Sequence, residues 1–106
     1  MSLKWPNKDP DEILDYSIDW SRFLSGATIS SVTWYVDDAD GVKTQLIPSG
    51  QLVNGIQLVS ATNTDTVTTA RRGSGSNNIL YQFYCRIADS NGLVVERKVR
   101  LRVRNK

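Results

Sequence analysis

Hydrophobic and polar residues alternate on both sides of a tight turn near the end of the chain, which predicts an antiparallel hairpin. The residues in 81–87 that share one apolar face are Tyr81, Phe83, Cys85 and Ile87. The second run, in 95–103, repeats the pattern with Val95, Val99, Leu101 and Val103. The turn between them is Asp89-Ser-Asn-Gly92. Alternation with a period of two on both sides of Asn-Gly is typical of a hairpin with one buried face.

Earlier segments show the same alternation and predict further strands. In 13–20 one face carries Leu14, Tyr16, Ile18 and Trp20, and in 28–36 it carries Val32, Trp34 and Val36. Shorter strands are expected at 42–47, 55–60 and 66–70, separated by turn residues. No segment of useful length has a helical period. We therefore predict an all-β fold, an immunoglobulin-like antiparallel β-sandwich of about seven strands. Trp34 would pack against Phe83 and Cys85 in a purely apolar core.

The chain of 106 residues predicts one domain. Residues 1–11 are expected to form an extended N-terminal arm, because Trp5 and Asp9 each precede a proline, which disfavours helix. Residues 12–106 then form the single β-sandwich domain. The segment 71–78, rich in Gly, Ser and Asn, is expected to be a mobile loop.

The net charge of +2 conceals an uneven distribution. Eight of the eleven acidic residues lie in the first 40 positions, and seven of the thirteen basic residues lie in the last 21. The outward positions of the last strand are Lys98, Arg100, Arg102 and Arg104, and those of the first include Asp15 and Asp19. If the first and last strands are neighbours, these charges form a cross-strand ladder. The alternative is a basic surface for an acidic partner, either protein or nucleic acid.

The residues needed for common catalysis are scarce. The chain has no histidine and one cysteine, so it lacks the commonest general base and cannot form an intramolecular disulfide. Cys85 occupies an inward position, which favours a core role. Asp37, Asp38 and Asp40 lack the spacing of a calcium loop, so a solvated turn is favoured. Gly73-Ser-Gly75 lacks the Lys and helix of a phosphate loop. We expect no enzyme activity, no cofactor and no metal. Because the chain has no apolar run of about 18 residues, we also expect no membrane insertion.

Five residues are candidates for contact with a partner: Trp5, Tyr35, Arg71, Arg72 and Tyr84. Tyr35 and Tyr84 occupy outward strand positions, where they either build an aromatic contact surface or fill cross-strand space. A tryptophan in an extended arm, Trp5, must fold back or dock on another surface. Arg71 and Arg72 border the Gly-Ser segment and either bind an anion or partner or belong to a mobile loop.

Three segments of the chain together resemble a family of small proteins of tailed phages and prophages. They are Lys8-Asp-Pro-Asp-Glu-Ile-Leu-Asp-Tyr-Ser-Ile-Asp-Trp20, Ile29-Ser-Ser-Val-Thr-Trp34 and Cys85-Arg-Ile87. Members of this family are found among head and tail morphogenesis genes and are sometimes labelled fiber–tail adaptors. The resemblance implies a non-catalytic structural protein of the virion that is assembled in the bacterial host cytoplasm. It would act at the tail or head–tail junction by contact with other phage virion proteins. Self-association is compatible with that role, whereas nucleic acid is a less favoured partner. The alternative function is a carbohydrate- or host-surface-binding sandwich module.

Overall fold

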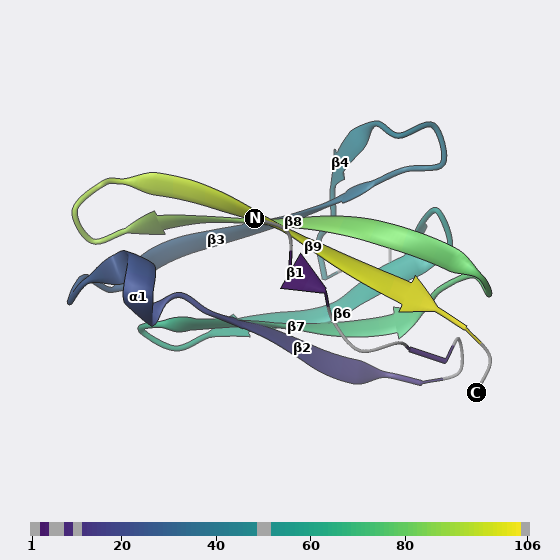
Figure 1. The fold of residues 1–106 in the computed structure, drawn as a ribbon, viewed down its shortest axis with the longest axis horizontal. Helices are drawn as coiled ribbons and strands as arrows, with labels where there is room; N and C mark the ends of the chain where they lie inside the picture. Colours follow the sequence, from purple (N-terminus) through teal and green to yellow (C-terminus); the bar gives the residue numbers. More distant parts are fainter. Residues whose placement is uncertain (1–2, 5–7, 10–11, 49–51, 105–106) are drawn as a thin grey trace.

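The computed structural model describes residues 3–4, 8–9, 12–48 and 52–104, and these form two facing β-sheets (Figure 1). The elements are β1 (Leu3–Lys4), β2 (Leu14–Asp19), α1 (Ser21–Leu24), β3 (Ile29–Asp37), β4 (Lys43–Gln45), β5 (Leu52–Val53), β6 (Ile56–Asn63), β7 (Val67–Ser74), β8 (Ile79–Asp89) and β9 (Val94–Val103). One sheet has the strand order β1-β9-β8-β3-β4 and the other β2-β7-β6-β5. The strands pair antiparallel except for β1, which runs parallel to β9. The predicted all-β sandwich is confirmed.

The closing hairpin is the longest paired unit of the five-stranded sheet. Its register places Tyr81 opposite Leu101 and Phe83 opposite Val99, so the two apolar faces coincide. At the turn, the Asp89 side chain accepts hydrogen bonds from the backbone N–H groups of Asn91 and Leu93, both at 2.9 Å. Gly92 has φ of 84°, a backbone conformation that favours glycine. The local turn chemistry and the period-two pattern therefore act together to fix the hairpin.

Inward-facing side chains of both sheets fill the space between the layers. Trp34 and Phe83 are buried at 3% and 0% exposure, and Cys85 lies beside them at 0%. The Trp20 indole N–H donates a hydrogen bond of 2.9 Å to the hydroxyl of Thr68, which satisfies a polar group inside the core. The predicted inward faces of the strands at 13–20 and 28–36 are confirmed for their central residues.

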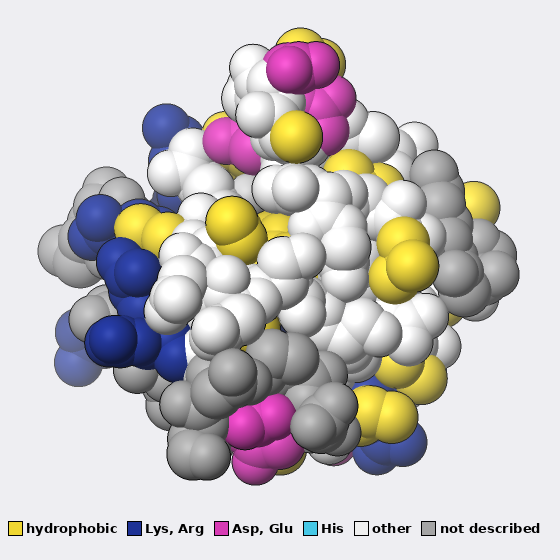
Figure 2. All heavy atoms as spheres, turned by 90° about the vertical axis from the view of Figure 1, so that its right-hand side faces the viewer, with side chains coloured by type: hydrophobic (Ala, Val, Ile, Leu, Met, Phe, Trp, Pro, Cys, Tyr) yellow, Lys and Arg dark blue, Asp and Glu magenta, His cyan; other side chains and the backbone are white. Residues whose placement is uncertain are grey.

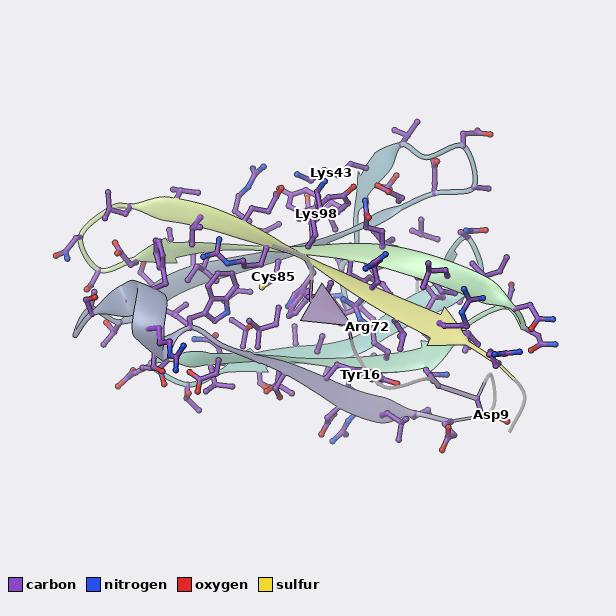
Figure 3. The ribbon with its side chains drawn as sticks, in the orientation of Figure 1. Asp9, Tyr16, Lys43, Arg72, Cys85 and Lys98 are labelled. Carbon is purple, nitrogen blue, oxygen red and sulfur yellow. The ribbon has the colours of Figure 1, made fainter. Side chains whose placement is uncertain are left out.

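Arg72 is a correction to the prediction of a purely apolar core. Strand β7 continues to Ser74, so the mobile loop expected at 71–78 is wrong for its first four residues. Thr68, Ala70 and Arg72 alternate onto the inward face of β7, and Arg72 is 0% exposed. Its guanidinium carbon lies 3.9 Å from the Phe83 ring centroid and 5.0 Å from that of Trp34. The core therefore holds a cation against two aromatic faces. Figure 3 shows Arg72 between the two sheets.

The placement of β2 is a second correction. Strand β2 pairs with β7 in the four-stranded sheet, whereas β9 lies in the other sheet. The predicted ladder between first-strand acids and last-strand bases is therefore wrong. Asp15 instead pairs with Arg71 of β7, at 2.8 Å between carboxylate oxygen and guanidinium Nε.

Part of the segment before residue 12 lies against the sandwich. Leu3 and Lys4 pair with Val99 and Arg100 of β9. Lys8 is fully buried, exchanges backbone hydrogen bonds with Arg102 and Arg104, and its ammonium donates to the backbone carbonyl of Ser74. These contacts join the N-terminal segment to both sheets. The division into an arm at 1–11 and a domain at 12–106 stays a prediction.

Candidate partner-contact surface

The outer face of the five-stranded sheet brings tyrosine rings and charged groups together. We call this group the tyrosine–lysine cluster; its members are Tyr35, Lys43, Tyr84, Arg86 and Glu96. The strand register assembles it, since Tyr35 lies opposite Tyr84 on β8, and Arg86 lies opposite Glu96 on β9. Lys43 reaches over this face from the edge strand β4 (Figure 3). Four strands therefore contribute to one continuous surface.

Lys43 is the central contact of the cluster. Its ammonium nitrogen lies 4.8 Å from the ring centroid of Tyr35 and 4.7 Å from that of Tyr84. The same nitrogen is 2.6 Å from the Glu96 carboxylate. The two cation–π contacts and the charge-assisted hydrogen bond all favour this one position of the ammonium. The cluster is therefore ordered by its own contacts.

Glu96 joins the two basic residues of the cluster. Its carboxylate accepts from Lys43 and also lies 3.1 Å from the guanidinium of Arg86. Partial burial opposes ionisation of Glu96, but the hydrogen bond and charge of Lys43, helped by Arg86, outweigh it and hold the pKa of the carboxyl below its ordinary value. The carboxylate is therefore charged at neutral pH.

Tyr84 is more enclosed than its outward strand position predicts. It is 8% exposed, whereas Tyr35 is half-buried, so the expected exposure of Tyr84 is wrong. The Tyr84 hydroxyl accepts a hydrogen bond of 2.8 Å from Gln82 and donates one of 3.1 Å to the Asp37 carboxylate. Burial, reinforced by Asp37, raises the pKa of the phenol. The ammonium of Lys43 therefore lies over a ring that exposes little surface of its own.

The other candidate contact residues lie elsewhere. Arg71 is exposed on the four-stranded sheet and donates hydrogen bonds to Asp15. These hydrogen bonds are the largest cause of the lowered pKa of Asp15. Arg72, on the inward face of the same strand, is enclosed in the core and offers no surface to a partner in this conformation. Trp5 lies outside the described residues. The structure therefore brings Tyr35 and Tyr84 together and separates Arg71 and Arg72 from them; contact with a partner stays a prediction for all.

Three members of the cluster, Lys43, Arg86 and Glu96, were missed by sequence reasoning. Glu96 is the single carboxylate between Val94 and Arg104, a run that contains five basic residues (Arg97, Lys98, Arg100, Arg102 and Arg104). That isolated acid was the available signal. No pattern in the sequence indicates that Lys43 folds over the sheet, because its position depends on the pairing of β4 with β3.

Two further chemical features of the sequence are the acidic turn at 37–40 and the single thiol of Cys85. Within the described residues there is no group of three or more His, Cys, Asp or Glu side chains placed to bind a metal ion. At the predicted solvated turn, Asp38 uses one carboxylate oxygen to accept from the backbone N–H groups of Asp40 and Val42, both at 2.9 Å. Burial raises the pKa of Cys85 to about 12, so this thiol is protonated at neutral pH. Helices that could cross a bilayer are absent from the described part of the chain.

The fold and this surface together define a class: a β-sandwich domain that carries tyrosine rings and paired charges on the outer face of its five-stranded sheet. The sequence profile of the family described as "Podophage GP4 fiber-tail adaptor protein gp77" matches residues 8–102. The chain belongs to this family of phage tail adaptors, which confirms the resemblance drawn from the sequence. No curated protein matches the chain.

Proposed function

We propose that this chain is a non-catalytic structural adaptor that binds other tail proteins of the phage particle through the outer face of its five-stranded sheet. It acts at the tail or head–tail junction by protein–protein contact, and it is assembled into the particle in the cytoplasm of the bacterial host. Membership of the fiber-tail adaptor family supports the structural role. The tyrosine–lysine cluster supports the choice of surface.

The observation that carries this proposal is the position of Lys43 over two tyrosine rings, with Glu96 fixing its charge. Binding energy at protein interfaces is concentrated in a few residues, among which Tyr, Trp and Arg are enriched. Ordering a side chain at an interface costs about 0.5–1.5 kcal/mol, and that cost is lower where the free protein already holds the side chain. The cluster meets both conditions.

A carbohydrate-binding module needs an open aromatic face. Trp20 and Trp34 are 2% and 3% exposed, so neither ring is available to a sugar. This observation favours the adaptor over the host-surface alternative. Self-association would be compatible with the adaptor role, because repeated weak contacts on a symmetric particle give high avidity.

The experiment is to measure how many copies of the chain are built into purified particles, by quantitative mass spectrometry against the major capsid protein. Tyr35→Ala and Lys43→Ala alter the cluster and should lower the copy number. Thr69→Ala, half-buried on β7 of the other sheet, and Arg22→Ala, exposed on α1, are matched controls that should not. Circular dichroism confirms that each variant folds. Equal copy numbers for all four variants, or absence of the wild-type chain from particles, would contradict the proposal.

A further inference from the structure

We propose that a basic stripe on β9, formed by Lys98, Arg100, Arg102 and Arg104, binds an acidic, extended segment of a partner protein. The inference rests on the proposed function, since it gives the chemistry of the partner that the outer face of the five-stranded sheet receives. The stripe adjoins the tyrosine–lysine cluster, because Lys98 lies opposite Tyr84 and its ammonium is 6.0 Å from that ring centroid.

The alternation of β9 separates these charges from the core. Val99, Leu101 and Val103 are all 0% exposed on the inward face. Of the stripe, Lys98, Arg100 and Arg104 are exposed and Arg102 is half-buried. Side chains two residues apart on one face of a strand are about 6.6–6.8 Å apart, so the stripe is about 20 Å long. An extended segment with carboxylates at alternate positions repeats at the same distance.

The charges of the stripe are not neutralised by the acids expected from the sequence. The first-strand acids belong to the other sheet, where Asp15 is paired with Arg71. On the outer face of the five-stranded sheet, Glu96 is engaged by Lys43 and Arg86, and Asp37 by Tyr84 and Gln82. The ion pairs found in the described part of the chain join Lys43 and Arg86 to Glu96 and Arg71 to Asp15, so none involves the stripe. Figure 2 shows Lys and Arg side chains gathered along one side of this end of the molecule.

The surroundings of the stripe favour a protein over a nucleic acid. Single-stranded nucleic acids are bound by stacking bases on open aromatic rings. Here Tyr84 is 8% exposed, and Tyr35 has Lys43 and Arg86 over its ring. The positive area is also bounded by acidic side chains on two sides (Figures 2 and 3). The β3–β4 turn carries them on one side. On the other side lies Asp9, which follows Lys8, and the Lys8 backbone carbonyl accepts a hydrogen bond from the Arg104 N–H. A short acidic segment fits between these acidic borders, whereas a long polyanion would meet them.

The test uses the full chain and a fluorescein-labelled peptide of alternating Glu and Thr, about eight residues long, enough to span the stripe. Fluorescence anisotropy measures binding at ionic strengths of about 0.05 and 0.3 M. We expect binding that weakens with salt. Arg100→Gln/Arg102→Gln should lower the association constant about tenfold, a change of about 1.4 kcal/mol. Arg100→Lys/Arg102→Lys keeps the charge and should stay within about threefold of wild type. Arg22→Gln, on α1, should bind as wild type.

Three results would overturn the inference: no peptide binding at low salt, equal binding by Arg100→Gln/Arg102→Gln and wild type, or tighter binding of an oligothymidine of the same charge. The last result would assign the stripe to nucleic acid. These outcomes are separable from the proposed function. If the peptide fails while wild-type chain is present in particles and Lys43→Ala lowers its copy number, only the inference fails. If the chain is absent from particles, the proposed function fails whatever the peptide does.

Discussion

Replacing Glu96 with glutamine tests whether the tyrosine–lysine cluster is held together by its carboxylate. In the wild type, Glu96 accepts from Lys43 at 2.6 Å and pairs with Arg86 at 3.1 Å. Glutamine keeps the size and one carbonyl oxygen but removes the negative charge. Lys43 and Arg86 then lie near each other without a carboxylate between them. The edge strand β4 loses its charged link to β9.

The magnitude follows from the exposure of the pair. The side chains of Lys43 and Glu96 keep 32% and 27% of their surface exposed, so solvent screens them only in part. Fully exposed ion pairs contribute about 0.2–1 kcal/mol, whereas hydrogen bonds to charged groups contribute about 1.5–3 kcal/mol. For a partly screened network with two basic partners, we expect Glu96→Gln to lower the free energy of unfolding by about 1–2 kcal/mol.

Urea unfolding at neutral pH, followed by circular dichroism, measures this loss. The matched control is Asp15→Asn, which removes one charge from an ion pair of 2.8 Å whose side chains are 51% and 50% exposed. The control should lose less stability than Glu96→Gln. A double-mutant cycle with Lys43→Met isolates the coupling between the two side chains. If Asp15→Asn costs as much stability as Glu96→Gln, partial enclosure does not strengthen the Glu96 network.

Three further predictions follow from single residues. The pKa of Glu96 lies below its ordinary value of 4.5, so the stability that the carboxylate contributes is present above that pH and is lost as pH falls through the folded-state pKa. From neutral to acidic pH, the free energy of unfolding should fall more steeply for wild type than for Glu96→Gln, and parallel curves would contradict this. Arg72→Ala should lower the free energy of unfolding by about 2–5 kcal/mol in urea titrations, because it leaves a cavity in the core. Arg72→Met keeps the volume and should cost less; equal losses would show that the charge of Arg72, and not its packing, determines the stability lost. The Tyr81 hydroxyl accepts a hydrogen bond from the Ser76 N–H at 2.8 Å and donates one to the Asn54 carbonyl at 2.7 Å. Tyr81→Phe should therefore lower the free energy of unfolding by about 1–3 kcal/mol in the same assay, and an unchanged stability would contradict that role.

Much of the fold was predictable because its strongest signals are local. The hairpin of β8 and β9 needs only alternation and an Asn-Gly turn, and the inward positions Tyr16, Ile18 and Trp20 follow from alternation within one strand. These signals act over a few residues, so the sequence carries them directly. Family resemblance then extended the prediction to a phage structural protein, which the match over residues 8–102 supports.

The errors arose where pairing partners, and not local pattern, decide the outcome. The expected ladder failed because it assumed that β2 lies beside β9, and strand order is not written in either strand. Arg72 was assigned to a loop because Gly and Ser follow it, although the alternation of Thr68 and Ala70 continues onto it. Charged residues are rarely fully buried, so composition outweighed alternation at that position. The cluster around Lys43 combines residues of four strands and could not be assembled without the sheet order.

The central claim is that this chain is a component of the phage particle whose five-stranded sheet faces another tail protein. Lysine cross-linking of purified particles, followed by mass spectrometry, tests it most directly, because Lys43 and Lys98 both lie on that face (Figure 3). The chain should be present in particles, and both lysines should cross-link to a different tail protein. If the chain is absent from particles, or is present with neither lysine linked to another protein, the five-stranded sheet does not face a tail protein in the particle.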